Sequence, residues 1–192
     1  MIVGLTGGIA SGKTVVARIF EMLGAAVFYS DKVAKDLYSD PEIKAGVIKL
    51  LGPKAYTSSG VNKTYIRKVI FADEHLLGGI NSIIHPAVGK KFGEYVIQNA
   101  GKLVLKESAL LFEAGVAEQC DRVIVVAAPD ELRLQRIIAR DKTTLAQAQK
   151  KLNSQLPQEQ KINKADYVIR NGEEELVIPQ VLTIYDTLNS NA

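Results

Sequence analysis

The sequence predicts an α/β protein built on a five-stranded, doubly wound parallel sheet. Five short apolar runs are spread along the chain, and helical patterns separate them. The runs are mostly continuous rather than alternating, as expected for strands that are buried on both faces of a sheet. In addition, a glycine-rich loop follows the first run and leads into an amphipathic segment. Such alternation of strand and helix is typical of doubly wound folds.

The predicted core elements follow one another along the chain. The strands span Ile2 to Thr6, Ala25 to Tyr29, Leu103 to Lys106, Arg122 to Ala127, and Tyr167 to Arg170. The helices span residues 13–23, with Gly24 as the stop, then Glu131 to Arg140 and Glu173 to Leu188. Together they predict a core made of residues 1–31, 101–135 and 165–192.

Two stretches between strands are longer than a plain crossover needs. Residues 32–100 are expected to form several helices around a loop at Thr57 to Gly60, and to carry an acceptor site. Residues 136–164 are polar, and Thr144 and Gln147 have the spacing of a capping box. We therefore expect a single domain with a helical insertion and a mobile helical lid.

Composition and charge narrow the classes of function. The chain has 192 residues, 47% of them hydrophobic, which suffices for a sizeable core. A net charge of +3 is too small to indicate a nucleic-acid groove, but it does not repel anionic substrates. A single cysteine, with neither a signal peptide nor a bilayer-length apolar run, fits a cytoplasmic protein. We expect no nucleic-acid or membrane partner, and a monomer or weak homo-oligomer.

The strongest motif lies directly after the first predicted strand. Gly7-Gly8-Ile9-Ala10-Ser11-Gly12-Lys13-Thr14 matches the phosphate-binding pattern G-x-x-x-x-G-K-[ST]. Its glycines let backbone N–H groups point at an anion, and the helix that continues through Val15 adds its positive dipole end. Lys13 is expected to reach the β- and γ-phosphates of a nucleotide, and the Thr14 hydroxyl to bind Mg²⁺.

Carboxylates at the ends of strands are the candidates for proton transfer and metal binding. If the second strand neighbours the first, Asp31 lies near the γ-phosphate and accepts the proton of an attacking hydroxyl. Alternatively, it caps a helix that starts at Lys32. Glu107 ends the third strand and is placed to hold Mg²⁺ through water or to meet substrate, and Glu113 follows it. For both glutamates the alternative is a charge that complements a helix dipole.

Three arginines are predicted to share one face of the helix that leads into the lid. Arg133, Arg136 and Arg140 are spaced i, i+3 and i+7. They form either a solvated polar face or a set of donors for the charge of a transferring phosphoryl group. Arg136 and Arg140 are the better candidates for the second role, because they lie nearer the lid.

The segment Asn163 to Asp166 matches the N-K-x-D guanine-recognition pattern of GTPases. In those proteins the motif follows a strand, whereas here it precedes the strand that starts at Tyr167. The aspartate would therefore lie at the wrong edge of the sheet for a nucleotide base. GTP recognition is not expected.

These motifs, taken together along the chain, resemble the dephospho-CoA kinase family. The matching pieces are the loop at 4–14, Ser30-Asp31, Val69 to Phe71, Ile84-His85-Pro86, Leu110 to Glu113, Arg136 with Arg140-Asp141, and Ala165 to Ile169 with Asn171-Gly172. The resemblance implies a P-loop kinase core, ATP with Mg²⁺, and the ribose 3′-hydroxyl of dephospho-CoA as acceptor. The products would be ADP and coenzyme A, in the last step of coenzyme A biosynthesis.

The resemblance also implies roles for residues. Asp31 corresponds to the catalytic base and Arg140 to a phosphate-contacting lid arginine, beside the Lys13 of the cradle. On this basis we expect Arg136, Asn171 and Gly172 to bind nucleotide. Further residues are expected to meet the acceptor: His85, Glu107, Leu110 and Glu113. The chain departs from the family pattern at Tyr29, Ala109, Lys63 and Lys151, and the two lysines stand where arginines are usual.

Two other functions share the phosphate cradle. A small-molecule P-loop kinase for a nucleoside, a nucleotide or shikimate would accept a different hydroxyl or phosphate. A nucleotide-controlled switch protein would hydrolyse nucleotide slowly, have no phosphoryl acceptor and require a partner. The compact length and the lack of a usable GTP-recognition motif count against the switch.

Overall fold

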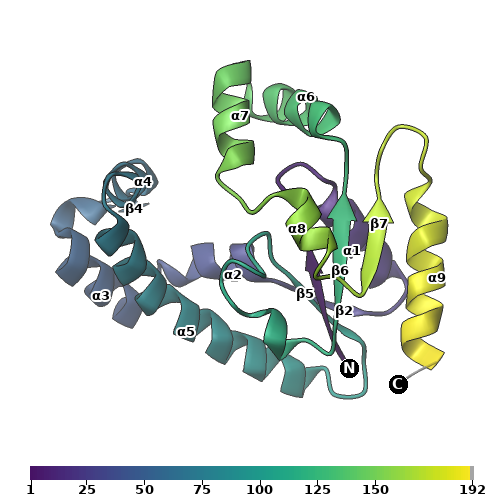
Figure 1. Cartoon of the computed structure of the whole chain (residues 1–192). Helices are drawn as coiled ribbons and strands as arrows, with labels where there is room; N and C mark the ends of the chain where they lie inside the picture. The colour runs from purple at the N-terminus through teal and green to yellow at the C-terminus, as the bar shows by residue number, and fades with distance from the viewer. Residues whose placement is uncertain (191–192) are drawn as a thin grey trace. The chain divides into compact units, whose positions relative to one another are not determined.

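The computed structural model describes residues 1–190 and contains a five-stranded parallel sheet. Its strands are β1 (Ile2–Thr6), β2 (Ala26–Tyr29), β5 (Val104–Glu107), β6 (Arg122–Ala127) and β7 (Tyr167–Arg170), shown in Figure 1. Each predicted strand is confirmed to within one residue, and β1, β2, β5 and β6 are mostly buried, as their apolar runs predict. The predicted doubly wound α/β fold is confirmed.

The order of the strands corrects one expectation. The sheet runs β2-β5-β1-β6-β7, so β2 does not neighbour β1. Instead β5 lies between them, and Glu107 pairs with Leu5 on one side and Tyr29 on the other. The carboxylate at the end of β5, rather than one at the end of β2, therefore stands beside the strand that carries the glycine-rich loop.

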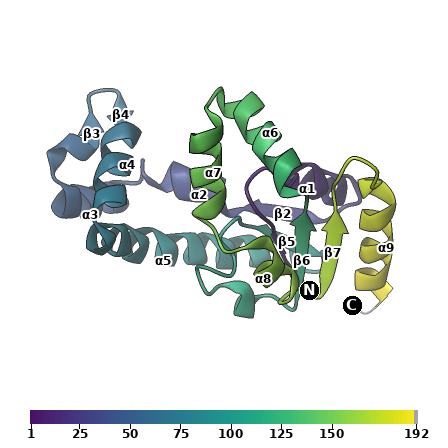
Figure 2. The same ribbon diagram turned by 45° about the horizontal axis from the view of Figure 1, so that its top comes forward.

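One face of the sheet packs against two helices, α1 (Lys13–Met22) and α9 (Val177–Ser190). Phe20 of α1 and Ile184 of α9 belong to the core over this face, and Figure 2 shows the two helices from a second direction. The predicted start of α9 at Glu173 is wrong by four residues. The preceding segment stays a loop because Gln180 bonds the backbone of Arg170 and Leu176.

The opposite side of the sheet is covered partly by the chain between β5 and β6. An ideal Cβ on Gly4 would lie 2.7 Å from Leu111 Cδ2, so this segment packs directly on β1. It ends in a short 3₁₀ helix, η2 (Ala117–Gln119). The segment predicted to be a lid, residues 136–164, contains the end of α6 (Asp130–Asp141), then α7 (Leu145–Asn153) and α8 (Gln158–Ile162), which packs against β6. The predicted capping box at Thr144 is confirmed.

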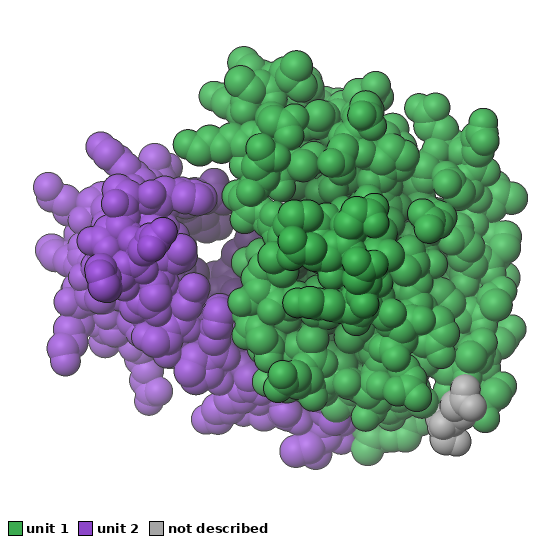
Figure 3. Space-filling model, viewed as in Figure 1, with its two compact units in different colours: residues 1–29, 99–192 green, residues 30–98 purple. Residues whose placement is uncertain are grey.

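Residues 30–98 form a second compact unit, distinguished by colour in Figure 3 from the unit of residues 1–29 and 99–192. The elements of this second unit are α2 (Ser30–Leu37), α3 (Pro41–Leu51), η1 (Pro53–Ala55), β3 (Tyr56–Thr57), β4 (Gly60–Val61), α4 (Lys63–Ala72) and α5 (Glu74–Gln98). It has its own apolar core around Val47, Ile66 and Ile84. The predicted loop at Thr57 to Gly60 is the turn of a small hairpin.

The position of Asp31 also corrects the sequence prediction. Helix α2 begins at Ser30, so Asp31 lies in its first turn and neither closes a strand nor caps a helix starting at Lys32. A carboxylate in the first turn favours the helix through the dipole.

Among the helices of residues 1–190, none is both long and apolar enough to cross a membrane.

The central strand should carry a large share of the stability. Leu5 of β1 is fully buried, whereas Leu176 is exposed. Leu5→Ala is expected to reduce the free energy of unfolding by about 2–5 kcal/mol, through lost burial and the cavity left behind. Leu176→Ala is the matched control and should change it by less than about 0.5 kcal/mol. Urea unfolding followed by circular dichroism measures both, and equal losses would contradict the assigned core.

Candidate active site

The glycine-rich loop between β1 and α1 adopts a backbone conformation that leaves no room for a side chain at two positions. Gly7 and Gly12 have positive φ angles of 149° and 101°. An ideal Cβ would lie 2.3 Å from the carbonyl oxygen of Val126 at Gly7, and 2.0 Å from Asn171 Nδ2 at Gly12. Glycine is therefore required at both, because the loop is packed tightly between the ends of β6 and β7.

The interior of this loop suits an anion. Helix α1 starts at Lys13, so its first N–H groups and the positive end of its dipole are at the loop. The Lys13 ammonium donates to the carbonyl oxygens of Gly7 and Gly8, at 2.9 and 3.2 Å. The Ser11 hydroxyl is buried and has no hydrogen-bond partner within residues 1–190. Phosphate oxygens would satisfy these donors.

The three arginines of α6 have different partners. Arg133 donates from Nε to the carbonyl oxygen of Ile9 at 3.0 Å, and Arg136 from Nη1 to that of Ala10 at 3.3 Å. Arg140 instead pairs with Asp141 at 2.7 Å. The structure thus brings Arg136, a predicted nucleotide-binding residue, to the loop. It also brings Arg133 there, the arginine that the sequence analysis ranked below Arg140.

The partner of Arg140 explains this difference. Asp141 receives hydrogen bonds from Arg140 and from Lys151. These bonds, that of Arg140 first, hold the pKa of the Asp141 carboxyl well below its usual range. The carboxylate therefore stays charged and keeps both cations at the junction of α6 and α7.

Two more side chains hold the outer rim of the loop. Asn171, predicted as a nucleotide-binding residue, donates from Nδ2 to the carbonyl oxygen of Ser11 at 2.8 Å. Gln155 of the lid accepts a hydrogen bond from Ile9 N at 2.7 Å. Sequence reasoning missed Gln155, because a single glutamine in a polar segment carries no distinguishing pattern.

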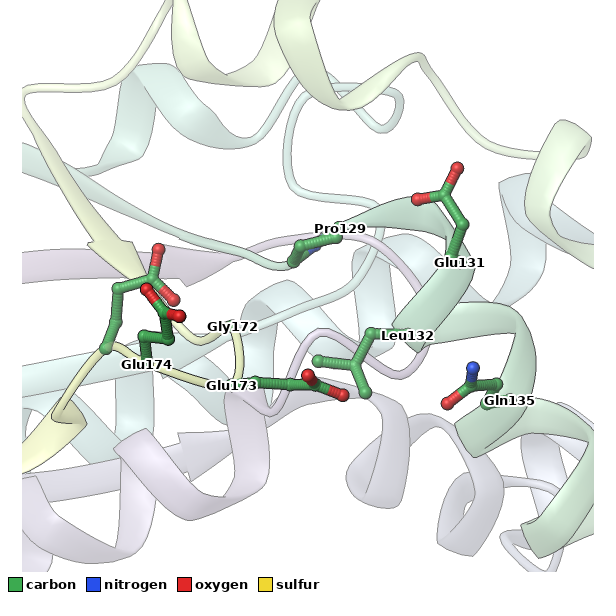
Figure 4. Close-up of a pocket in the computed structure, with 8 residues that line it drawn as sticks. Pro129, Glu131, Leu132, Gln135, Gly172, Glu173 and Glu174 are labelled. Carbon is green, nitrogen blue, oxygen red and sulfur yellow. The ribbon is translucent and has the colours of Figure 1, made fainter.

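A cavity of about 360 Å³ lies between the start of α6 and the loop after β7. Figure 4 shows the side chains of Pro129 and Leu132 on the α6 side and the carboxylates of Glu173 and Glu174 on the other. Gly172, predicted as a nucleotide-binding residue, also lines it. The lining combines the apolar Pro129 and Leu132 with four glutamates and Gln135, so hydrogen-bond acceptors are available to a ligand that carries an amino group.

The edge formed by the carboxyl ends of β5 and β2 carries Glu107 and Tyr29. Glu107 is buried and lies in register with Tyr29. Burial, followed by the charge of Glu21, raises the pKa of Tyr29 to about 12, and Glu107 adds to the effect. Tyr29 therefore remains neutral well above neutral pH. Asp31 follows it by two residues, within the second unit.

Of three residues predicted to meet the acceptor, Glu113 is engaged by other residues, whereas Leu110 and His85 are exposed. Glu113 pairs with the fully buried Lys161 at 2.7 Å and accepts from Leu156 N at 3.1 Å, so it anchors the lid. Leu110 is partly exposed in the loop after β5. His85 is exposed on α5, inside the second unit.

The segment Asn163 to Asp166, which matches the guanine-recognition pattern, has a structural role at the start of β6 and β7. Asp166 precedes β7 and accepts a hydrogen bond from Val123 N, at the start of β6, at 2.8 Å. It therefore lies at the amino end of the parallel strands, away from the glycine-rich loop at their carboxyl ends. The prediction that this motif does not serve GTP recognition is supported by its position.

The fold and the loop together define a P-loop nucleotide-binding protein. The dephospho-CoA kinase family model matches residues 1–176. A dephospho-CoA kinase of Chlorobaculum tepidum is 40% identical over 98% of this chain and 95% of its own. The chain belongs to the dephospho-CoA kinase family, which confirms the resemblance seen in its sequence.

Solved structures agree with this assignment. A crystal structure from Thermus thermophilus superposes with a TM-score of 0.89 at 26% identity, over 98% of this chain and 97% of the other. The dephospho-CoA kinase from Campylobacter jejuni superposes with a TM-score of 0.73 at 26% identity, over 100% and 98% of the two chains. The likeness therefore extends over the helical unit and the lid as well as the sheet.

The single cysteine should be unreactive in the folded protein. Burial raises the pKa of the Cys120 thiol to about 11, although the nearby charge of Lys106 lowers it. At pH 8 the thiolate fraction should be about a hundredfold below that of an ordinary cysteine. Native protein should therefore react at least about a hundredfold more slowly with an aromatic disulfide reagent than protein in denaturant. Equal rates would show that the thiol is accessible and ionised.

Proposed function

We propose that this protein transfers the γ-phosphoryl group of ATP to the ribose 3′-hydroxyl of dephospho-CoA, giving coenzyme A and ADP. The observation that carries the proposal is the phosphate cradle at residues 7–14, within a chain that matches the dephospho-CoA kinase family over residues 1–176. A cytosolic setting is part of the proposal, and a single thiol that can form no internal disulfide supports it.

The nucleotide site combines the cradle with the cavity beside it. Backbone N–H groups of the loop and the Lys13 ammonium bind the phosphates, and their positive charge stabilises the transferring group. Arg136, Asn171 and Gly172 support the loop and the base cavity. Arg140 pairs with Asp141 in this structure. We propose that it exchanges this carboxylate for a phosphate oxygen of the nucleotide, to which it donates a hydrogen bond.

The residues present fit a Mg²⁺ ion that is bound together with nucleotide. Within residues 1–190 no group of three metal-binding side chains converges. Mg²⁺ needs only one or two protein oxygens when phosphates and water complete its shell. The Thr14 hydroxyl and the Glu107 carboxylate would hold the ion, which supplies charge neutralisation at the phosphates when bound.

The acceptor side is assigned to Asp31 and the helical unit. Asp31 follows β2, whose last residue pairs with Glu107, and its carboxylate is exposed. It would orient the acceptor hydroxyl and receive its proton. The helical unit, including His85, and the exposed Leu110 would bind dephospho-CoA, and the lid at residues 136–164 would exclude water during transfer.

An acceptor panel tests the proposal. ADP release should accelerate with dephospho-CoA and remain at background with adenosine, AMP or shikimate. Lys13→Ala should lower turnover by more than about a hundredfold, because it removes a charge that binds the γ-phosphate. Faster ADP release with AMP or shikimate than with dephospho-CoA would show that dephospho-CoA is not the preferred acceptor. Release that no acceptor changes would favour a nucleotide switch.

The role of Asp31 can be separated from helix stabilisation. Asp31→Asn should lower turnover about 10²- to 10⁴-fold, because the amide cannot accept the proton. ATP affinity should stay near the wild-type value, since the cradle is unchanged. Asp36→Asn, an exposed aspartate of the same helix, is the matched control and should retain full turnover. An Asp31→Asn protein with near wild-type turnover would show that another residue is the general base, with Glu107 as the next candidate.

A further inference from the structure

Arg133 is a buried cation that the proposed mechanism does not use. It lies in the first turns of α6, and its side chain is only 3% exposed. A guanidinium is rarely buried unless an anion compensates its charge, because loss of hydration is costly. The groups around Arg133 therefore indicate which anion compensates its charge.

The guanidinium rests on the backbone of the phosphate cradle. An ideal Cβ on Gly8 would lie 2.0 Å from Arg133 Nη2 and 2.5 Å from its Cζ, so no side chain could occupy position 8 without moving the arginine. Nε of Arg133 donates to Ile9 O at 3.0 Å. The cation is thus fixed against two consecutive residues of the loop.

A second cation contacts the same glycine. The Lys13 ammonium donates to the Gly8 carbonyl oxygen at 3.2 Å, and α1 presents the positive end of its dipole at Lys13. Two cations therefore converge on the first half of the loop, and the positive end of the α1 dipole lies at its second half. Their mutual repulsion raises the energy of the loop without ligand, and a bound anion removes that repulsion.

The carboxylate beside Arg133 compensates its charge only in part. Asp130 accepts a hydrogen bond from Nη1 at 2.8 Å, but its own side chain is 55% exposed and screened by water. Burial lowers the pKa of the Arg133 guanidinium, and Asp130 opposes this. Part of the charge therefore remains available to an anion in the cradle.

We propose that Arg133 is a positioning residue that raises the affinity of the cradle for the terminal phosphate of a nucleoside triphosphate. It acts through the loop backbone at Gly8 and Ile9. The inference rests on the proposed nucleotide site, and it adds selectivity for triphosphate over diphosphate. A purely structural arginine would hold the loop through Ile9 O and would not distinguish ligands by charge.

Equilibrium binding of adenosine, AMP, ADP and ATP tests the inference without relying on turnover. Arg133→Gln should weaken ATP binding about tenfold and ADP binding about threefold, with little change for AMP and none for adenosine. Arg133→Lys keeps the charge and should remain within about threefold of the wild type for every ligand. Arg122→Gln is the matched control, because this exposed arginine starts β6 and pairs with Asp166.

A second variant is expected to tighten ATP binding, which misfolding could not do. Asp130→Asn removes the carboxylate that partly neutralises Arg133, at a largely exposed position. ATP binding should become about two- to threefold tighter. Tighter binding in this variant cannot be caused by damage to the fold.

The outcomes separate this inference from the proposed function. Arg133→Gln losses that are equal for all four ligands would overturn it, as would an Arg133→Lys protein as weak as Arg133→Gln. Unchanged or weaker ATP binding in Asp130→Asn would also overturn it. If the wild-type protein binds no ATP, the proposed function fails instead.

Discussion

Close packing of the glycine-rich loop against the carboxyl ends of β6 and β7 is the constraint on which the rest of the core depends. The loop has to leave β1, turn around an anion and enter α1 within a few residues. Val126 O and Asn171 Nδ2 stand where side chains of Gly7 and Gly12 would be. The register that places β6 beside β1 therefore also sets the shape of the phosphate site.

This arrangement concentrates positive charge in a small, partly buried region. Lys13, Arg133 and Arg136 each donate to a carbonyl oxygen of the loop. These contacts satisfy the donors but leave net charge, because carbonyl groups carry none. A bound nucleotide would relieve the repulsion, so ligand affinity and the stability of the loaded protein are linked.

The sequence predicted the strands well and their order poorly, for physical reasons that particular residues illustrate. Runs such as Arg122 to Ala127 are apolar on both faces, which few structures other than a buried parallel strand allow. Nothing in such a run says which strand lies beside it, and the position of β5 between β2 and β1 was therefore missed. Likewise, helical spacing placed the three arginines on one face, but the partners Asp141 and Ile9 come from tertiary structure.

The lid is attached to the core at its second half. Lys161 is fully buried, pairs with Glu113 and donates to Ala109 O, so removing Glu113 would leave a buried charge without its counterion. Gln155 adds the bond to Ile9 N at the cradle itself. A lid that moves while it keeps these contacts has to move between Asp141 and Ser154. That segment contains α7 and the exposed Lys151, whose partner Asp141 ends α6, while α8 packs against β6.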